Sequence, residues 1–341
     1  MGITKLADLI RAEAPGAVSH RDISDYSEKV IALDTSIIVN QFRAKVPHLS
    51  LLMGFFYRTL TFLEHDIKPV FVIDGKPPVE KTAVVREAMF FTQDHPLTSS
   101  QIKDCLQLLK HMGVPVIQAP GDAEALCAQL VKDGTVDAVA SEDMDTLPFG
   151  ASVLLRGLNA SRDTDVTEYS LAKLVEQLQI SHEELIDLCI LLGCDYCDKI
   201  PGLGPKKALK LIQKHRCIEN VVLHVNRQTH PVPHFWKYKE ARKIFLDTPH
   251  VPTPELTWTE PDEEALVFFL CRTKHNREER VRRRMEKYRE TRKNRQEERD
   301  MDKMAGHSRQ TRMEDFWRVT RKRSVAAADS SSSSNKRPKL K

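Results

Sequence analysis

The chain is 341 residues long, so it can bury a sizeable core and is long for one compact domain. Its 52 lysines and arginines against 48 aspartates and glutamates leave a net charge of +4, so any nucleic-acid partner must be met by local basic patches. No apolar run approaches the ~20 residues needed to cross a bilayer, which argues against a membrane protein, and the seven scattered cysteines are typical of a reducing compartment.

The first half of the chain alternates between short runs rich in β-branched residues and helical patterns. The runs lie at 30–34, 69–74, 115–120, 136–141 and 153–157, and each ends at an acidic or turn residue. Between them, 48–66 has apolar residues at helical spacing, and 122–134 begins with acids and closes at a glycine. This order predicts an α/β fold built on a mostly parallel twisted sheet.

The next region, from about 168 to 270, has few strand signals. Its stretches 170–196 and 204–215 have helical periodicity and predict a helical subdomain packed on the sheet. Within it, Cys194 and Cys197 have the spacing of a zinc knuckle, but no second pair completes four ligands. We therefore expect buried thiols rather than zinc.

The segment after 271 is almost wholly charged. Glu278 and Arg282 form an i,i+4 pair in the favourable order, as do Glu279 and Arg283, which predicts a solvated helix. Because its apolar stripe is thin, we expect this helix to pack weakly. The serine-rich sequence after about 305 has the composition of a disordered tail.

Acidic residues gather where the predicted strands end, which is where open parallel sheets bind ligands. Such a cluster is tolerable only if cations neutralise it, and hard divalent ions with oxygen ligands do this best. Two ions roughly 4 Å apart would activate water for phosphodiester hydrolysis, and the acids need not transfer protons. The predicted ligands are Asp34, Asp74, Asp122, Glu124, Asp143, Asp145 and Asp195.

Each acid alone has a structural explanation. Asp122 is explained as a helix cap, Asp74 as a turn residue and Glu142 as a solvated neighbour of the others. Their joint placement at strand ends favours the metal site.

The turn at 200–208 lies between two predicted helices. Gly202 and Gly204 expose backbone amides there, Pro205 suits a helix start, and Lys206 and Lys207 add positive charge. Amides at a helix N-terminus bind phosphate without reading bases, so the turn predicts contact with a nucleic-acid backbone. A tight interhelical turn with no ligand is the structural alternative.

Five motifs in order together resemble the flap endonucleases of the XPG superfamily of structure-specific 5′-nucleases. They are MGI at 1–3, DGKPP at 74–78, APGDAEA at 119–125, SEDMDTLPFG at 141–150 and LLGCDYCDKIPGLGPKKALKLI at 191–212. The likeness runs from residue 1 to about 271 and resumes near 310. It implies a PIN-like nuclease core, two Mg²⁺ or Mn²⁺ ions at the seven acids, and a helix-two-turn-helix at about 187–216 that holds duplex DNA through K⁺. It also places Gly2, the first residue after removal of Met1, near the DNA junction.

The sequence departs from the family at several of these sites. The family has Glu where this chain has Asp122, which puts direct contact with one metal in doubt. Asn40 stands where the family stacks an aromatic residue on a base. The helical arch, at about 79–104, is shorter and poor in lysine and arginine; Lys81 matches its first lysine, but Ala88 occupies the position of its catalytic arginine.

Arg86 lies two residues before that position. Two residues turn a helix by about 200°, so Arg86 points elsewhere if the segment is helical. We predict Lys81 and Arg86 as the catalytic arch residues, and Arg43 and Arg156 as further DNA contacts. With fewer arch cations, the expected enzyme is a metal-competent nuclease with weaker or broader substrate choice.

The tail carries a short motif followed by basic clusters. Gln310, Met313, Phe316 and Trp317 have the spacing of one polar and three apolar side chains on a 3₁₀ turn, and they resemble the family's box for the sliding clamp PCNA. The basic clusters 321–323 and 336–339 predict nuclear import.

The predicted function is hydrolysis of 5′ flaps in branched double-stranded DNA during replication and repair, with 5′–3′ exonuclease activity, by a monomer in the nucleus. One alternative is a weakened or inactive binder of branched DNA recruited by the clamp. Another is a nuclease of the same superfamily with other branch specificity. The predicted regions are an N-terminal nuclease region (1–110), an internal nuclease region (111–271), a charged helical extension (272–305) and a disordered tail (306–341).

Overall fold

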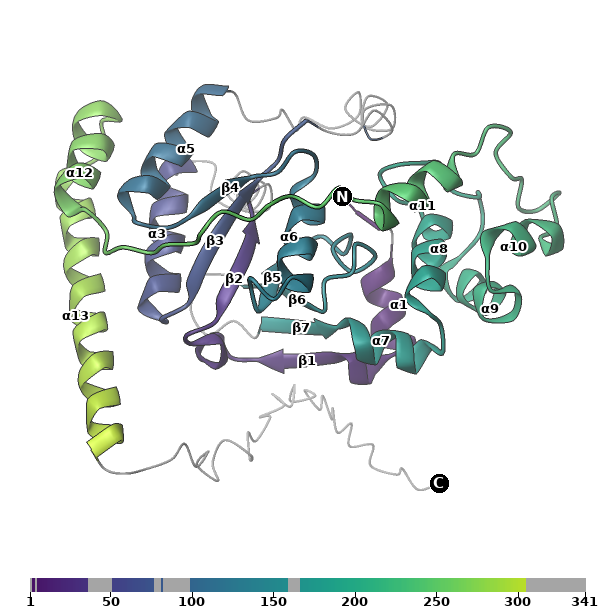
Figure 1. The fold of residues 1–341 in the computed structure, drawn as a ribbon, viewed down its shortest axis with the longest axis horizontal. Helices are drawn as coiled ribbons and strands as arrows, with labels where there is room; N and C mark the ends of the chain where they lie inside the picture. The colour runs from purple at the N-terminus through teal and green to yellow at the C-terminus, as the bar shows by residue number, and fades with distance from the viewer. Residues whose placement is uncertain are drawn as a thin grey trace, which may run out of the picture. The chain divides into compact units, whose positions relative to one another are not determined.

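The computed structural model describes residues 2–3, 5–35, 51–76, 81, 99–158 and 166–304 (Figure 1). The chain divides into two units, Met1–Arg292 and Lys293–Lys341. The first unit contains the sheet, the helical region and every described residue of the predicted site. In the second unit, the described part is the end of the last helix.

A seven-stranded sheet forms the centre of the described part of the first unit, with strand order β1-β7-β6-β5-β2-β3-β4. The strands from β6 to β4 are mutually parallel, and β7 runs antiparallel to both β6 and β1. The predicted α/β class with a mostly parallel sheet is therefore confirmed, while β1 and β7 were not predicted. The strands are β1 (Val18–Arg21), β2 (Val30–Asp34), β3 (Lys68–Ile73), β4 (Val116–Gln118), β5 (Ala138–Ala140), β6 (Val153–Arg156) and β7 (Val166–Ser170).

Helices cover both faces of the sheet, and alternation along the strands separates two cores. Along β2, Ile31 and Leu33 belong to one core and Ala32 to the other, as expected for side chains that alternate across a strand. The Ile31 face packs against α3 (Leu51–Glu64), α5 (Ser99–His111), α12 (Glu263–Val267), the π-helical turn η3 (Phe268–Thr273) and the start of α13 (Glu278–Met304). The Ala32 face packs against α1 (Leu6–Glu13) and α6 (Ala123–Lys132). Two 3₁₀ turns, η1 (Pro15–Ala17) and η2 (Ile23–Tyr26), flank β1.

The predicted helical region follows β7 and packs in the core that contains Ala32. Figure 1 shows it beside α1. It contains α7 (Leu171–Leu178), α8 (His182–Leu192), α9 (Pro205–His215), α10 (Ile218–His224) and α11 (Tyr238–Leu246). Ser181 and Glu184 form a reciprocal capping box that starts α8. Arg242 of α11 makes ion pairs with Asp187 at 2.7 Å and Glu219 at 2.9 Å, which ties α8, α10 and α11 together.

The charged helix α13 packs closely, and the expectation of weak packing is wrong. Val281, Met285 and Tyr288 are at most 3% exposed in the core with α3, because the thin apolar stripe faces a matching apolar surface. Arg284 pairs with Glu64 of α3, and both side chains are nearly buried.

Although α13 is 27 residues long, it is highly charged. No helix in the described ranges is both long and apolar enough to span a bilayer.

Arg284→Ala tests whether this ion pair secures α13. The substitution leaves the Glu64 carboxylate buried without its partner, so we expect a loss of about 3 kcal/mol in the free energy of unfolding. Urea titration followed by far-ultraviolet circular dichroism measures the change. The matched control is Arg283→Ala, whose pair with Glu279 is about 80% exposed on both sides and is expected to contribute under ~1 kcal/mol. Equal losses in the two variants would contradict the interpretation.

Candidate metal centre

The fold brings the seven predicted acids to one edge of the sheet. Adjacent parallel strands β5, β2, β3 and β4 end side by side, so the residues that follow them meet at their carboxyl ends. Asp34 ends β2, Asp74 follows β3, Asp122 and Glu124 begin α6 after β4, Asp143 and Asp145 lie in the loop after β5, and Asp195 follows α8.

Three of these acids have the geometry of a metal site. Oxygen atoms of Asp74, Asp122 and Glu124 all lie within 4.8 Å of one another. Oε2 of Glu124 is buried and has no hydrogen-bond partner among the described residues. An orphaned buried carboxylate oxygen is costly unless a cation contacts it, so the arrangement fits a divalent ion.

The N-terminus of α6 is capped by an acid from another part of the chain. Asp122 occupies the N-cap position, but its side chain makes no capping hydrogen bond. The amide of Ala123 instead donates to Oδ1 of Asp74 at 2.9 Å, so a carboxylate from another strand caps the helix. The interpretation of Asp122 as a helix cap is therefore wrong. Its carboxylate accepts a hydrogen bond from the Tyr196 hydroxyl at 2.6 Å and pairs with Nζ of Lys81 at 3.1 Å.

The N-terminal residues hold the acids that follow β5. The amide of Ile3 donates to Oδ1 of Asp145 at 2.9 Å, and the amide of Asp145 donates to Oδ1 of Asp143 at 3.2 Å. Gly2 has φ +91°, and a Cβ there would lie 1.7 Å from Oδ1 of Asp143. Only glycine fits so close to this carboxylate. Gly2, predicted as a DNA contact, therefore lies directly beside the acid cluster.

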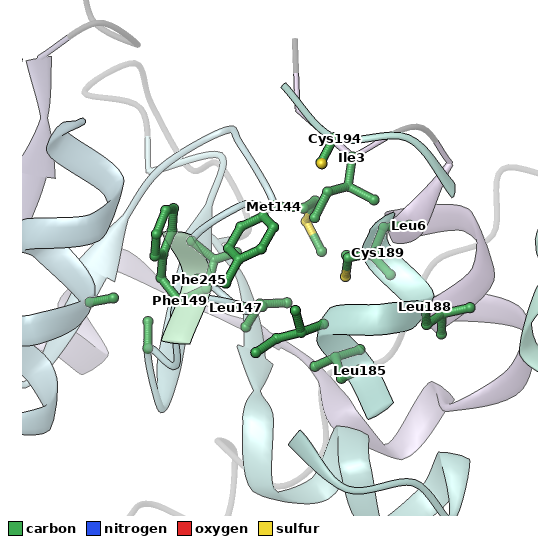
Figure 2. Close-up of a cluster of buried hydrophobic side chains, with 14 of the residues drawn as sticks. Ile3, Leu6, Met144, Leu147, Phe149, Leu185, Leu188, Cys189, Cys194 and Phe245 are labelled. Atoms are coloured by element: carbon green, nitrogen blue, oxygen red, sulfur yellow. The ribbon is translucent and has the colours of Figure 1, made fainter. Parts of the chain in front are cut away.

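An apolar cluster behind these acids fixes their loop. Met144 lies between Asp143 and Asp145 in sequence, and its side chain is buried in the core on the Ala32 face. Figure 2 shows Met144 in a group with Ile3, Leu147 and other side chains of this core. Packing of Met144 on the apolar side leaves the two neighbouring carboxylates at the acid cluster.

Burial and mutual repulsion raise the pKa values of several acids. Removal of water, together with charges on neighbouring carboxylates, holds the pKa of Glu124 and of Asp145 well above the usual range. The pKa of Asp195 is raised for the same reasons, and so is that of Asp74, although Asp74 lies at the exposed rim. The charges that act on Glu124 include those of Asp34, Asp74 and Asp143, so the acids form one electrostatic group.

Lys81 supplies a positive charge inside this group. Burial lowers its pKa, but the charges of Glu124, Asp122 and Asp195 outweigh burial and raise the pKa above its usual value. Its Nζ also lies 6.0 Å from the centre of the Tyr196 ring. The predicted arch lysine therefore stays protonated at neutral pH and contacts the acids.

The predicted phosphate-binding residues lie away from the acids, at the turn before α9. Gly204 is the N-cap residue of α9, with Pro205 at its first position, as expected. Lys206 pairs with Glu13 at 3.0 Å, and Nζ of Lys207 lies 2.6 Å from Nε2 of His230.

The remaining predicted residues fall into two groups. Arg156 ends β6 and faces Glu142 at 3.7 Å, so Glu142 is an ion-pair partner rather than only a solvated neighbour. The other predicted residues lie outside the described part of the chain; they are Arg43, Arg86, Gln310, Met313, Phe316 and Trp317.

Cys194 and Cys197 are buried free thiols, as expected, with their sulfur atoms 3.9 Å apart.

Two other residues at or near the site were missed. Tyr196 lies between these cysteines and holds Asp122, and its position directly after Asp195 was the available signal. Arg58 is buried on α3; removal of water lowers its pKa to about 10, and the charge of Glu142 acts in the opposite direction. An arginine within the apolar pattern of 51–64 was the signal for it.

Comparison with known proteins gives a family for this fold and site. The XPG N-terminal domain matches residues 1–88 and the XPG I-region matches residues 113–195, so the chain is of the XPG class. A probable flap endonuclease 1 homolog from Danio rerio is 59% identical over 350 residues, which cover 100% of both chains. The chain belongs to the flap endonuclease family.

Solved structures agree with this assignment. The catalytic core of Rad2 in complex with a DNA substrate is 25% identical, with a TM-score of 0.69 over 83% of this chain and 98% of that one. The Holliday junction-resolving enzyme GEN1, in complex with product DNA and Mg²⁺, is also 25% identical, with a TM-score of 0.58 over 77% of this chain and 72% of that one.

Glu124→Gln tests whether the cluster is built for cations. Without divalent ions, removing one buried charge from a like-charged group relieves repulsion, so we expect the Tm to rise by several degrees, at roughly 2–4 °C per kcal/mol. With Mg²⁺ added, the wild type should gain stability and the variant should gain less. Thermal melts with EDTA and with Mg²⁺ measure both effects. Glu176→Gln, at an exposed position on α7, is the control. A variant that gains as much from Mg²⁺ as the wild type would exclude Glu124 from the metal site.

Proposed function

We propose that this protein is a structure-specific 5′ flap endonuclease that hydrolyses phosphodiester bonds in branched DNA, with 5′–3′ exonuclease activity, in DNA replication and repair. The observation that carries the proposal is the orphaned, buried carboxylate oxygen of Glu124 within a cluster of acids at the carboxyl ends of parallel strands. The name of its full-length relative and the DNA-bound structures of its structural neighbours support the choice of substrate.

The seven acids are the proposed ligands, direct or through water, of two Mg²⁺ or Mn²⁺ ions. When bound, divalent ions supply activation of water and stabilisation of the leaving oxygen. The chain's contribution is to hold the carboxylates in place before binding, through Ala123 on Asp74, Tyr196 on Asp122 and Ile3 on Asp145. Hydrogen bonds to the remaining carboxylate oxygens fix the orientation of metal ligands.

Lys81 is proposed to contact the scissile phosphate. Its ammonium lies 3.1 Å from Asp122, at the acids, and is about four-fifths buried. A cation so placed stabilises negative charge that develops on the phosphate during hydrolysis. Arg86 is proposed to assist it from the arch segment.

Duplex DNA is proposed to bind at the turn before α9. The amides at the N-terminus of this helix and the exposed side chains of Lys206 and Lys207 favour phosphate, without reading sequence. The K⁺ ion implied by the family resemblance belongs to the same turn. Gly2, Arg43 and Arg156 are proposed as further DNA contacts, closer to the cleavage site.

The remaining proposals rest on the sequence. The motif formed by Gln310, Met313, Phe316 and Trp317 is proposed to bind the sliding clamp PCNA, and the basic clusters 321–323 and 336–339 to direct the protein to the nucleus. We propose that the protein binds the branch point as a monomer. We also propose that its chain is divided into the nuclease and extension regions outlined above.

Asp145→Asn tests the hydrolytic function. The amide oxygen can still accept from the Ile3 amide, so the fold is retained while one ligand charge is lost. With Mg²⁺ and a labelled 5′-flap duplex, the wild type should release a product, and the variant should be slower by at least about 100-fold in kcat. Product analysis on denaturing gels gives the rates. A wild type that binds the flap without cutting it would make the protein a branched-DNA binder, and faster cleavage of bubbles or junctions at fixed salt would change the branch specificity.

A blocked 5′ end tests whether the flap passes through the arch. We expect strong suppression of cleavage when a bulky group is attached to the 5′ end before the enzyme is added, because a blocked end cannot pass through the arch. The same group attached after the enzyme has bound should have little effect. Equal cleavage rates with free and blocked ends would exclude threading for this chain.

A further inference from the structure

The loop between α10 and α11, residues 225–237, presents an aromatic side chain to solvent. Phe235 is 93% exposed, more than any other large apolar side chain in the described part of the first unit. Its neighbour Trp236 is half-buried, and the two therefore have opposite environments. A single exposed apolar side chain is common on a protein surface, so what matters for Phe235 is where its loop lies and which charges surround it.

Three contacts fix this loop to the proposed DNA-binding turn. The indole Nε1 of Trp236 donates to the carbonyl of Asp198 at 2.5 Å. His230 is buried between Lys207 and the carbonyl of Pro201, at 2.6 Å and 3.4 Å. Because a lysine ammonium only donates, Nε2 of His230 accepts and its Nδ1–H donates to Pro201.

The turn is also shaped to receive the loop. Gly202 has φ +74°, and a Cβ there would lie 3.2 Å from Nδ1 of His230 and 3.3 Å from the carbonyl oxygen of Thr229. The two segments therefore pack closely at this point. The loop that carries Phe235 is thus held against the turn.

The charge around Phe235 favours an anionic partner. Four cationic or titratable side chains, His234, Lys237, Lys239 and Arg227, are exposed on the loop or at the start of α11, against two exposed acids nearby, Glu240 and Asp198. A DNA backbone presents both phosphates, which suit these cations, and deoxyribose faces, which suit a phenyl ring.

We propose that Phe235 is a second duplex-DNA contact, which packs on the deoxyribose face of a strand whose phosphates bind the turn before α9. The contact extends the DNA-binding surface beyond the helix-two-turn-helix, and it does not depend on the DNA sequence. It rests on the proposed function for its substrate, but it concerns binding and not cleavage.

Binding of a plain labelled duplex in EDTA, followed by fluorescence anisotropy over a series of salt concentrations, tests the proposal. Phe235→Ala should raise Kd by about 5- to 10-fold, the size expected for loss of one aromatic contact with DNA. Its salt dependence should match the wild type, because no cation is lost. Lys207→Ala should instead reduce the slope of log K against log salt by about 0.9.

Two control variants make the result specific. Phe235→Tyr keeps the ring and should bind like the wild type. Leu223→Ala removes another exposed apolar side chain, on α10, and should leave Kd unchanged. Circular dichroism melts confirm that each variant is folded.

The proposal is overturned if Phe235→Ala binds the duplex as tightly as the wild type, if Leu223→Ala weakens binding equally, or if the wild type does not bind duplex. Flap cleavage in Mg²⁺ is measured separately. A wild type that binds duplex but does not cut flaps would overturn the proposed function and leave this contact intact. If the wild type cuts flaps and Phe235→Ala binds duplex as tightly as the wild type, the proposed function stands and this contact is overturned.

Discussion

Holding several carboxylates close together against their mutual repulsion is the constraint on which the rest of this molecule depends. Burial makes the repulsion stronger, because water no longer screens the charges of Glu124 and Asp145. The free energy that offsets it comes from apolar packing on the other side of the same backbone. Met144 lies between Asp143 and Asp145 in the sequence, and the amide of Ile3 donates to Asp145. The side chains of Met144 and Ile3 are buried in one core, so displacing an acid would expose apolar surface.

This arrangement explains why the acids come from distant parts of the sequence. A parallel sheet delivers the ends of neighbouring strands to one edge at fixed spacing, and the N-terminus of α6 adds a positive dipole there. Asp74 satisfies that helix end and remains near Glu124. One carboxylate therefore links β3 and α6 while it completes the cluster, so local stability and the proposed metal binding rest on the same residue.

The sequence predicted the strands that carry the acids, because buried parallel strands are continuous β-branched runs, as at 30–34. It did not predict β1 or β7, which pair antiparallel at the sheet edge and carry polar residues such as His20 and Glu168. The close packing of α13 was also missed, because its partner Glu64 lies 220 residues from Arg284. The positions of the acids followed from local patterns, whereas the contacts that orient them, such as Tyr196 on Asp122, join segments that only the fold brings together.

The position of Asp122 shows what a shorter side chain does in this setting. Where the resembled family has Glu, this Asp is already engaged by the Tyr196 hydroxyl and by Lys81, and it follows the glycine that ends the loop before α6. These two contacts leave lone pairs on both carboxylate oxygens, so they orient Asp122 and still allow it to contact an ion. Oxygen atoms of Asp74, Asp122 and Glu124 lie within 4.8 Å of one another, so all three remain candidate ligands, direct or through water. Lys81 pairs with the same carboxylate, so its ammonium lies beside these candidate ligands.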